Sequence, residues 1–243
     1  MLDNIDITKI LFFDIETVPG AETHDALDET WKGLWAHKAQ SILRKTAADM
    51  TESDASDVYN RAGIYAEFGK IICISAGFIA LDKTTSAYKA RVKSFANDDE
   101  KILLQDFSAM MNKSYNDTER QFLCGHNIRE FDVPYISRRL MINQLPLPKM
   151  FEVAGKKPWE VKHLIDTMEL WKFGDLKSFT SLKLLAAALG FPSPKEDIDG
   201  SDVHRVYYEE KDLPRIAKYC EKDVIAVMRL LMKYKLMPDE LHI

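Results

Sequence analysis

Three things are scarce in this sequence of 243 residues: cysteine, long apolar runs and positive charge in excess. Its three cysteines, Cys73, Cys124 and Cys220, are far apart and form no Cys-X-X-Cys pair, which argues against a disulfide framework or a zinc site and fits a reducing cytoplasm. No stretch approaches the roughly 18 uninterrupted apolar residues of a membrane span, and residues 1–20 carry charges where a signal peptide has an apolar core. We therefore expect a soluble, cytoplasmic protein with no membrane partner.

The charge balance also narrows the classes of partner. With 33 lysines and arginines against 38 aspartates and glutamates, the formal net charge is -5, so the chain has no overall basic field of the kind that attracts nucleic acid. A nucleic-acid partner would have to be held by local contacts. Hydrophobic residues make up 46% and charged residues 29%, which is typical of a folded chain with one large core. The sequence gives no indication of oligomeric state.

The most informative stretch lies near the N-terminus, at Asp14-Ile15-Glu16. The apolar run 10–13 before it is typical of a central strand that is covered on both faces. Side chains alternate along a strand, so Asp14 and Glu16 emerge on the same side. Two ionised carboxylates at the end of a buried strand lose hydration and repel each other, and a divalent cation would relieve both costs. The alternative is a strand end that simply meets solvent.

Residues 21–66 differ in character from the strand before them. They are polar and alanine-rich, and their apolar residues, among them Trp31 and Trp35, recur at helical spacing. We therefore expect a mostly helical insertion between the first and second strands. It would act either as an added packing layer or as a lid over a substrate.

The rest of the chain alternates between strand and helix patterns. Further strands are expected at 71–80, 87–95, 122–124 and 164–165, and helices at 97–111, 133–142, 178–189 and 212–236. We predict an α/β fold in which a five-stranded mixed sheet is flanked by helices, as one domain over residues 1–243.

A second informative stretch, residues 125–134, lies where the fourth expected strand gives way to a helix. Asp132 is open to two compatible interpretations: the N-cap of that helix, with Pro134 in its first turn, or a further carboxylate presented to a metal. His126 has no second histidine at metal-binding spacing, so we expect a structural role for it. Asn127 could tie the loop backbone together or contact a substrate phosphate.

A third stretch lies in the last expected helix. Tyr219 and Asp223 are four residues apart, which places them on the same helix face. Val224, Val227 and Leu231 continue an apolar side that would dock the helix on the core. Taken alone, the pair is also compatible with a surface aspartate beside a half-buried tyrosine.

Together the three stretches resemble the exonuclease motifs of the DEDD superfamily, in its tyrosine-containing (DEDDy) branch. The matching segments are Phe13-Asp14-Ile15-Glu16-Thr17, Asn127 with Phe131-Asp132, and Tyr219 with Asp223. The signature residues occur in the expected order, and the resemblance extends from Ile10 to about Leu231. Within the superfamily, the chain is most similar to a stand-alone relative of the 3′–5′ exonuclease domain of family-B DNA polymerases.

This resemblance implies a ribonuclease-H-like fold and hydrolysis of phosphodiester bonds with two Mg²⁺ or Mn²⁺ ions. It implies four carboxylate ligands for the metals: Asp14, Glu16, Asp132 and Asp223. It implies that Tyr219 orients the attacking water, and that three further residues contact the substrate: Thr17, Asn127 and Phe131. Carboxylate oxygens suit these hard ions better than sulfur or imidazole does. The implied reaction is the stepwise 3′→5′ release of nucleoside 5′-monophosphates from single-stranded ends.

The sequence leaves the substrate class open. We predict an exonuclease that acts on single-stranded DNA, and the first alternative is an exoribonuclease, because the metal and phosphate chemistry is common to both. A third hypothesis is a non-catalytic nucleic-acid-binding module on the same fold. Such a module is expected to have lost acidic ligands, whereas this chain keeps all four.

Residues on either side of the fifth expected strand are candidates for contact with the nucleic-acid strand. The densest basic cluster precedes that strand: Lys156, Lys157, Lys162 and His163. Three aromatic residues follow it, and they either stack on bases or pack in the core: Trp171, Phe173 and Phe179. Arg129 is either a phosphate contact or a solvated loop residue. Asp166 is a further acid near the strand end, and we assign it no catalytic role.

Overall fold

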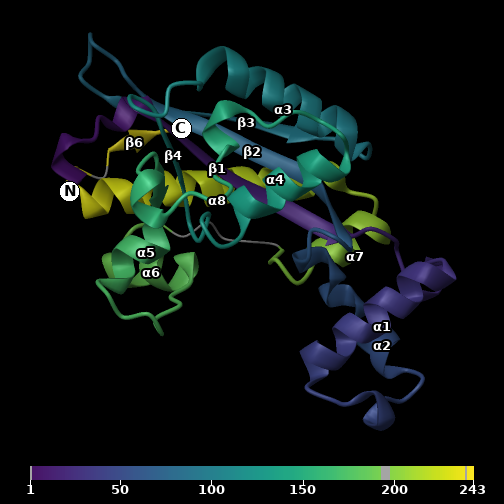
Figure 1. The fold of residues 1–243 in the computed structure, drawn as a ribbon. Helices are drawn as coiled ribbons and strands as arrows, with labels where there is room; N and C mark the ends of the chain where they lie inside the picture. The colour runs from purple at the N-terminus through teal and green to yellow at the C-terminus, as the bar shows by residue number, and fades with distance from the viewer. Residues whose placement is uncertain (1, 193–197, 239) are drawn as a thin grey trace.

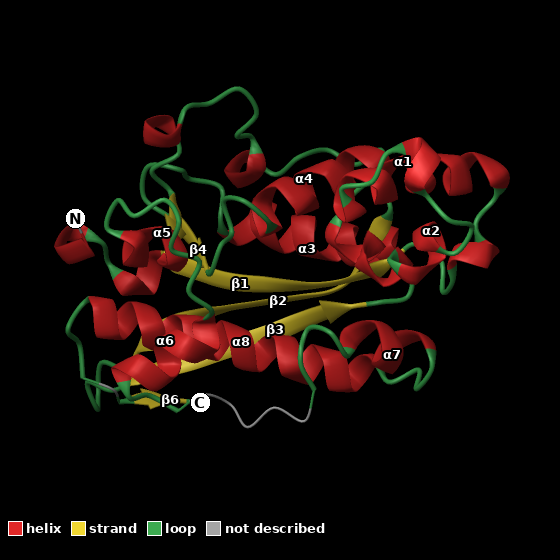
Figure 2. Cartoon of the chain, turned by 90° about the horizontal axis from the view of Figure 1, so that it is seen from below, coloured by secondary structure: helices red, strands yellow, loops and turns green. Residues whose placement is uncertain are grey.

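The computed structural model describes residues 2–192, 198–238 and 240–243, and in it a twisted mixed sheet lies between two layers of helices (Figures 1 and 2). The described residues include six strands: β1 (Ile10–Pro19), β2 (Gly69–Leu81), β3 (Tyr88–Ala96), β4 (Phe122–Gly125), β5 (Leu164–Asp166) and β6 (Leu241–His242). Their order across the sheet is β5-β4-β1-β2-β3-β6. β1 is central, antiparallel to β2 and parallel to β4. The predicted mixed α/β sheet is confirmed.

The prediction of five strands is wrong by one. β6 adds a two-residue edge strand at the C-terminus, where Leu241 pairs with Tyr88 and His242 with Lys89. A pairing of two residues leaves no alternating pattern in the sequence, so periodicity could not have found it.

Eight helices are described: α1 (Glu29–Leu43), α2 (Asp54–Asp57), α3 (Glu100–Ser114), α4 (Asp132–Ile142), α5 (Thr167–Lys172), α6 (Leu182–Leu189), α7 (Val203–Tyr208) and α8 (Leu213–Tyr234). α3 and α4 cover one face of the sheet and α8 covers the other (Figure 2). The alternation of β1 explains this arrangement, because Leu11, Phe13 and Ile15 pack toward α3 and α4 while Ile10 and Phe12 pack toward α8. In the described part of the chain, no helix is long and apolar enough to cross a membrane.

The segment between β1 and β2 folds as a small helical body of its own. α1 and α2 enclose a separate apolar cluster centred on Trp35, whose indole N–H donates to the Ala55 carbonyl oxygen at 2.7 Å. The body lies beyond the Pro19 end of β1 and does not form a layer over the sheet (Figure 1). Its helical character is as predicted.

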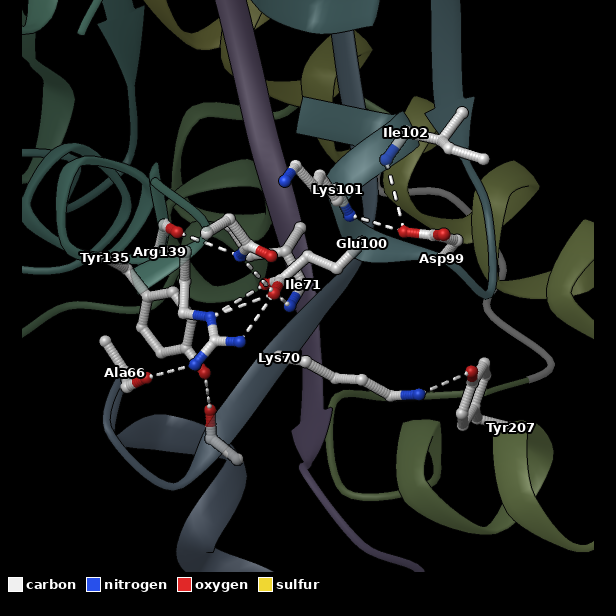
Figure 3. Close-up of polar contacts among 12 residues, drawn as sticks. Ala66, Lys70, Ile71, Asp99, Glu100, Lys101, Ile102, Tyr135, Arg139 and Tyr207 are labelled. Atoms are coloured by element: carbon white, nitrogen blue, oxygen red, sulfur yellow. Dashed lines mark hydrogen bonds and ion pairs between the residues drawn. The ribbon is translucent and has the colours of Figure 1, made fainter. Parts of the chain in front are cut away.

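A buried ion pair fastens this body to the sheet and the helices (Figure 3). Glu100, at the start of α3, is 7% exposed and lies 2.5 Å from the Arg139 guanidinium of α4. Arg139 also donates to the Ala66 carbonyl oxygen at 2.8 Å, and the Ile71 amide of β2 donates to Glu100 at 2.7 Å. One charge pair therefore joins three parts of the chain that are distant in sequence: residues 66–71, the start of α3, and α4.

Candidate active site

Asp14 and Glu16 lie on the central strand β1, on the face that α8 covers. They alternate in phase with Phe12, which packs against α8. Glu16 is 8% exposed. The pairing of β1 with β2 shifts register between Glu16 and Thr17. Such bulges re-aim side chains and are frequent next to active sites.

Asp132 reaches the same place from the loop that follows β4. β4 runs parallel to β1 and ends beside it. Gly125 permits this close approach, because a Cβ atom there would lie 2.9 Å from the Phe13 carbonyl oxygen and would overlap Ile128. Asp132 is 3% exposed, and its carboxylate accepts a backbone hydrogen bond from Ile15 of β1.

The interpretation of Asp132 as a helix N-cap is wrong by one residue. α4 begins at Asp132 itself, and Phe131 occupies the N-cap position without a capping hydrogen bond from its side chain. The Asp132 carboxylate accepts hydrogen bonds from its own backbone amide and from the Ile15 amide of β1. The cap pattern in the sequence located the helix start to within one residue and missed the bond of the side chain to β1.

Asp166, at the end of β5, holds the loop that carries Asp132 in shape. Its carboxylate accepts hydrogen bonds from the backbone amides of Asn127 and Arg129, both at 3.0 Å. The same carboxylate caps α5 through the Met168 amide at 2.9 Å. Asn127 has a left-handed backbone with φ 68°, which asparagine adopts more readily than most residues. Sequence analysis missed this positioning role, because it depends on a contact between segments nearly 40 residues apart.

α8 brings Tyr219 and Asp223 to the same side of the sheet. Between them, the buried Cys220 thiol lies 3.4 Å from the Asp14 carbonyl oxygen and 3.5 Å from Asp14 Oδ2, which fixes the crossing of α8 over β1. Tyr219 is half-buried and packs against an apolar cluster that includes Val18. Asp223, one turn further on, is close enough for its charge to raise the pKa of Asp14.

The four carboxyl groups therefore converge, and their proximity changes their protonation. Burial raises the pKa of Asp14 well above its ordinary value, and the charges of Asp132, Glu16 and Asp223 raise it further. Burial also raises the pKa of Asp132 to about 7. Ligand atoms of Asp14, Glu16 and Cys220 all lie within 4.8 Å of one another. A divalent cation that displaced protons from this cluster would relieve its internal repulsion.

Thr17 and Phe131 are connected through Tyr135 of α4. Thr17 and Tyr135 share a side-chain hydrogen bond, and the rings of Phe131 and Tyr135 lie 5.3 Å apart. The Tyr135 hydroxyl donates to the Gly63 carbonyl oxygen at 2.7 Å. Two of the predicted substrate contacts are thus linked to the end of the helical insertion.

His126 and Arg129 serve the scaffold. The two ring nitrogens of His126 lie 2.9 Å from Thr167 Oγ1 and 2.9 Å from the Thr180 carbonyl oxygen, which confirms the expected structural role. Burial lowers the pKa of His126, so the ring is held neutral. Arg129 donates to the Leu164 carbonyl oxygen at 2.6 Å and lies 3.3 Å from Glu169, so it is not a solvated loop residue. Its contact with a substrate phosphate stays a prediction.

His163 does not belong to a basic surface cluster. Its ring is 3% exposed, Nε2 lies 3.0 Å from the Met150 carbonyl oxygen, and burial lowers its pKa. The lysines of the expected cluster, Lys156, Lys157 and Lys162, are exposed.

The aromatic residues after β5 divide into two kinds. Phe173 is 91% exposed and Phe179 is 64% exposed, with Lys172 Nζ 4.2 Å from the Phe179 ring centroid. The core-packing interpretation is wrong for these two. It holds for Trp171, which stacks on Tyr234 with 6.1 Å between ring centroids.

A comparison with protein families shows which family the chain belongs to. Residues 64–243, well over half of the chain, match a family described as "Predicted 3'-5' exonuclease related to the exonuclease domain of PolB". The chain belongs to this family. The matched residues of the chain include Asp132, Tyr219 and Asp223. Asp14 and Glu16 lie on β1, before the matched region.

Solved structures agree on the fold. The family B DNA polymerase of the hyperthermophilic archaeon Pyrobaculum calidifontis matches 93% of this chain with a TM-score of 0.53 and 15% identity. The match covers 24% of the polymerase chain. This similarity shows the fold alone, and it confirms the predicted ribonuclease-H-like fold class. No protein of curated function matches the chain.

Proposed function

We propose that the chain is a metal-dependent 3′–5′ exonuclease that releases nucleoside 5′-monophosphates one at a time from single-stranded nucleic acid. One observation carries the proposal: the carboxyl groups of Asp14, Glu16, Asp132 and Asp223 converge from β1, the first residue of α4, and α8. Membership of a family of predicted 3′–5′ exonucleases supports the reaction class.

The donor set fits two Mg²⁺ or Mn²⁺ ions. These ions prefer carboxylate oxygen and water, and four clustered carboxyl groups, two of them with raised pKa, are the arrangement that divalent charge would stabilise. Asp14, Glu16, Asp132 and Asp223 would hold them. Bound metals of this kind activate water and neutralise charge that develops on phosphate oxygens.

The protein groups around this centre would orient the reacting atoms. The Tyr219 hydroxyl would position the attacking water. Thr17, Asn127 and Phe131 would position the terminal nucleotide. The hydrogen bond of Asp166 to the Asn127 amide supports this role, because it keeps the loop in one conformation.

The segment between α5 and α6 offers a path for the rest of the strand. Its Thr180 carbonyl oxygen is bound by His126, so it lies beside the loop that carries Asp132. Phe173 and Phe179 are exposed there, with Lys172 close to Phe179. Exposed aromatic rings next to cations accept stacked bases without regard to sequence, which suits single-stranded substrates.

End-labelled oligonucleotides test the proposal. Single-stranded DNA or RNA labelled at the 5′ end, incubated with the protein and Mg²⁺ or Mn²⁺, should shorten into a ladder of one-nucleotide steps. A 3′-terminal label should appear at once as a mononucleotide. Absence of mononucleotide release with both metals and both nucleic acids would refute the proposal.

A chemically matched pair of substrates resolves the nucleic-acid class. DNA and RNA strands of identical sequence differ at the 2′-hydroxyl, which a cleft can accept or reject. The ratio of the two kcat/KM values assigns the preference.

The Tyr219→Phe variant should keep strand binding and lose most of kcat, since it retains the ring and removes the hydroxyl.

A further inference from the structure

A pocket on the opposite side of the sheet from Asp14 has no part in the proposed reaction. It opens where α3 ends and the sheet continues, and it has a volume of about 490 Å³. Leu11, Ala76 and Phe95 line it, on the face that packs toward α3. Asp14 points to the other face, because it is adjacent to Phe13 in the alternating strand β1.

The walls of the pocket combine flat apolar surface with one sign of charge. Phe78, 37% exposed, and the half-buried Tyr115 supply aromatic rings at the surface, whereas Phe95 is 7% exposed and belongs to the floor. The charged residues that line it are Lys9, Arg91 and Lys93. Among the described lining residues, none is an aspartate or a glutamate. In a chain of net charge -5, this is a local concentration of positive charge over an apolar floor.

The two strand cations that line the pocket differ from the neighbouring lysine on the same strand in having no ion pair among the described residues. Lys89 of β3 pairs with Asp82 at 2.8 Å. Arg91 and Lys93, two and four residues further on, form no ion pair with any residue that the structure describes, and Lys93 Nζ lies 4.7 Å from the Phe95 ring. Cations on exposed strands also discourage edge pairing, yet that role needs neither a hollow between them nor aromatic walls.

We propose that this pocket binds an organic anion in which a flat ring system carries a phosphate, sulfonate or carboxylate group. The ring would lie against Phe78 and the apolar floor of the pocket, and the anionic group would meet Lys9, Arg91 and Lys93. A volume of about 490 Å³ suits a ligand of mononucleotide size. Two sources share this chemistry, nucleoside 5′-phosphates and other aromatic acids. The proposal depends on the pocket alone and stands apart from the proposed nuclease function.

A fluorescent anion tests it directly. 1-Anilinonaphthalene-8-sulfonate should bind the protein saturably in EDTA, where metal-mediated phosphate binding is absent. The Arg91→Glu/Lys93→Glu variant should weaken this binding at least tenfold. The matched control Arg138→Glu/Lys149→Glu makes the same charge change at two exposed positions away from the pocket and should stay within twofold of wild type.

Two further arms complete the test. Phe173→Ala/Phe179→Ala should retain the binding. This result separates the pocket from the segment between α5 and α6 that carries these two rings, which we call the exposed aromatic loop. Displacement of the probe by a nucleoside 5′-monophosphate identifies nucleotides as the source, and displacement by an aromatic carboxylate alone identifies the other source. Equal binding by the Arg91→Glu/Lys93→Glu variant and wild type, or a probe that neither anion displaces, overturns the proposal. Nuclease activity of that variant should equal wild type.

Discussion

The Asp166 carboxylate accepts a hydrogen bond from the Asn127 backbone amide at 3.0 Å. Through this contact the end of β5 shapes the loop that leads to Asp132. Asp166 is itself 3% exposed and serves a second backbone segment at the start of α5. An acid that sequence reasoning set aside is therefore a positioning residue for the candidate active site.

Replacing Asp166 by alanine should damage both stability and activity. The variant leaves several backbone N–H groups without their acceptor, so we expect a loss of about 2–4 kcal/mol in the free energy of unfolding. Activity should fall even at temperatures where the variant is folded. Urea unfolding and initial cleavage rates measure the two effects. Asp106→Ala, at an exposed position of α3, is the control and should behave as wild type in both assays.

The pH dependence of the metal-free protein should reveal the raised pKa of Asp132. A carboxyl group with a pKa of about 7 in the folded state and an ordinary value near 3.8 in the unfolded state binds its proton more tightly when folded. Its contribution to stability is therefore lost as pH rises toward and through 7, by at most about 1.4 kcal/mol per pH unit. We expect the unfolding free energy of wild type to fall relative to that of Asp132→Asn between pH 5.5 and pH 8.

Comparing these two proteins at each pH removes the contribution of the buried histidines. The lowered pKa of His126 and of His163 acts in the opposite direction, since it costs stability as pH falls below about 6.5. Both proteins contain the same histidines. Mg²⁺ should stabilise wild type more at pH 8 than at pH 5.5, because protons compete with the metal. A difference between wild type and Asp132→Asn that does not change with pH would contradict the assignment.

The buried ion pair between Glu100 and Arg139 should be costly to break from one side. Arg139→Met leaves the Glu100 carboxylate buried without its charge partner, and we expect a loss of about 3–5 kcal/mol. Glu100→Gln/Arg139→Met should recover part of that loss, because no buried charge remains. Lys32→Met, which breaks the exposed pair with Glu29, should cost about 0.5 kcal/mol or less. Equal costs for the buried and the exposed pair would disprove this account of how the insertion is fastened.

The exposed aromatic loop should contribute to strand binding and little to stability. In an Asp14→Asn background, which prevents degradation, Phe173→Ala/Phe179→Ala should weaken binding of a single-stranded oligonucleotide by about 1–3 kcal/mol per stacked base. The melting temperature should not change, since both rings are largely exposed. Met141→Ala removes an apolar side chain of α4 that is 63% exposed and lies outside this loop, and it is the control. Fluorescence anisotropy measures the binding. An equal loss of binding in the control variant would contradict a specific role for the loop.

The strong periodic signals of the sequence were sufficient for the framework. The apolar run before Asp14 predicted a central strand, and the spacing of Val224, Val227 and Leu231 predicted the docking face of α8, because both depend on local alternation. The helical insertion was equally visible. Motif spacing also named the four acids whose convergence the structure then describes.

What the sequence could not supply depends on tertiary contacts. Nothing in the sequence around Asp166 indicates that it accepts a hydrogen bond from a distant loop. Nothing local indicates that Phe131, and not Asp132, is the N-cap residue of α4. A hydrophobic side chain such as that of Phe173 would be expected to be buried from its type alone. Its exposure depends on which segments pack nearby, which the sequence does not show. These are the places where long-range structure overrides a local pattern.

The most direct test of the central claim is the rate at which the 3′-terminal nucleotide is released from a 5′-labelled single strand in Mg²⁺, compared among wild type, Asp14→Asn and Asp223→Asn. Wild type should produce a ladder of one-nucleotide steps, and both variants should be slower by at least a hundredfold while remaining folded. They should also lose the stabilisation by Mg²⁺ that wild type gains. Variants that degrade the strand as fast as wild type would contradict the assignment of these carboxylates to a nuclease centre.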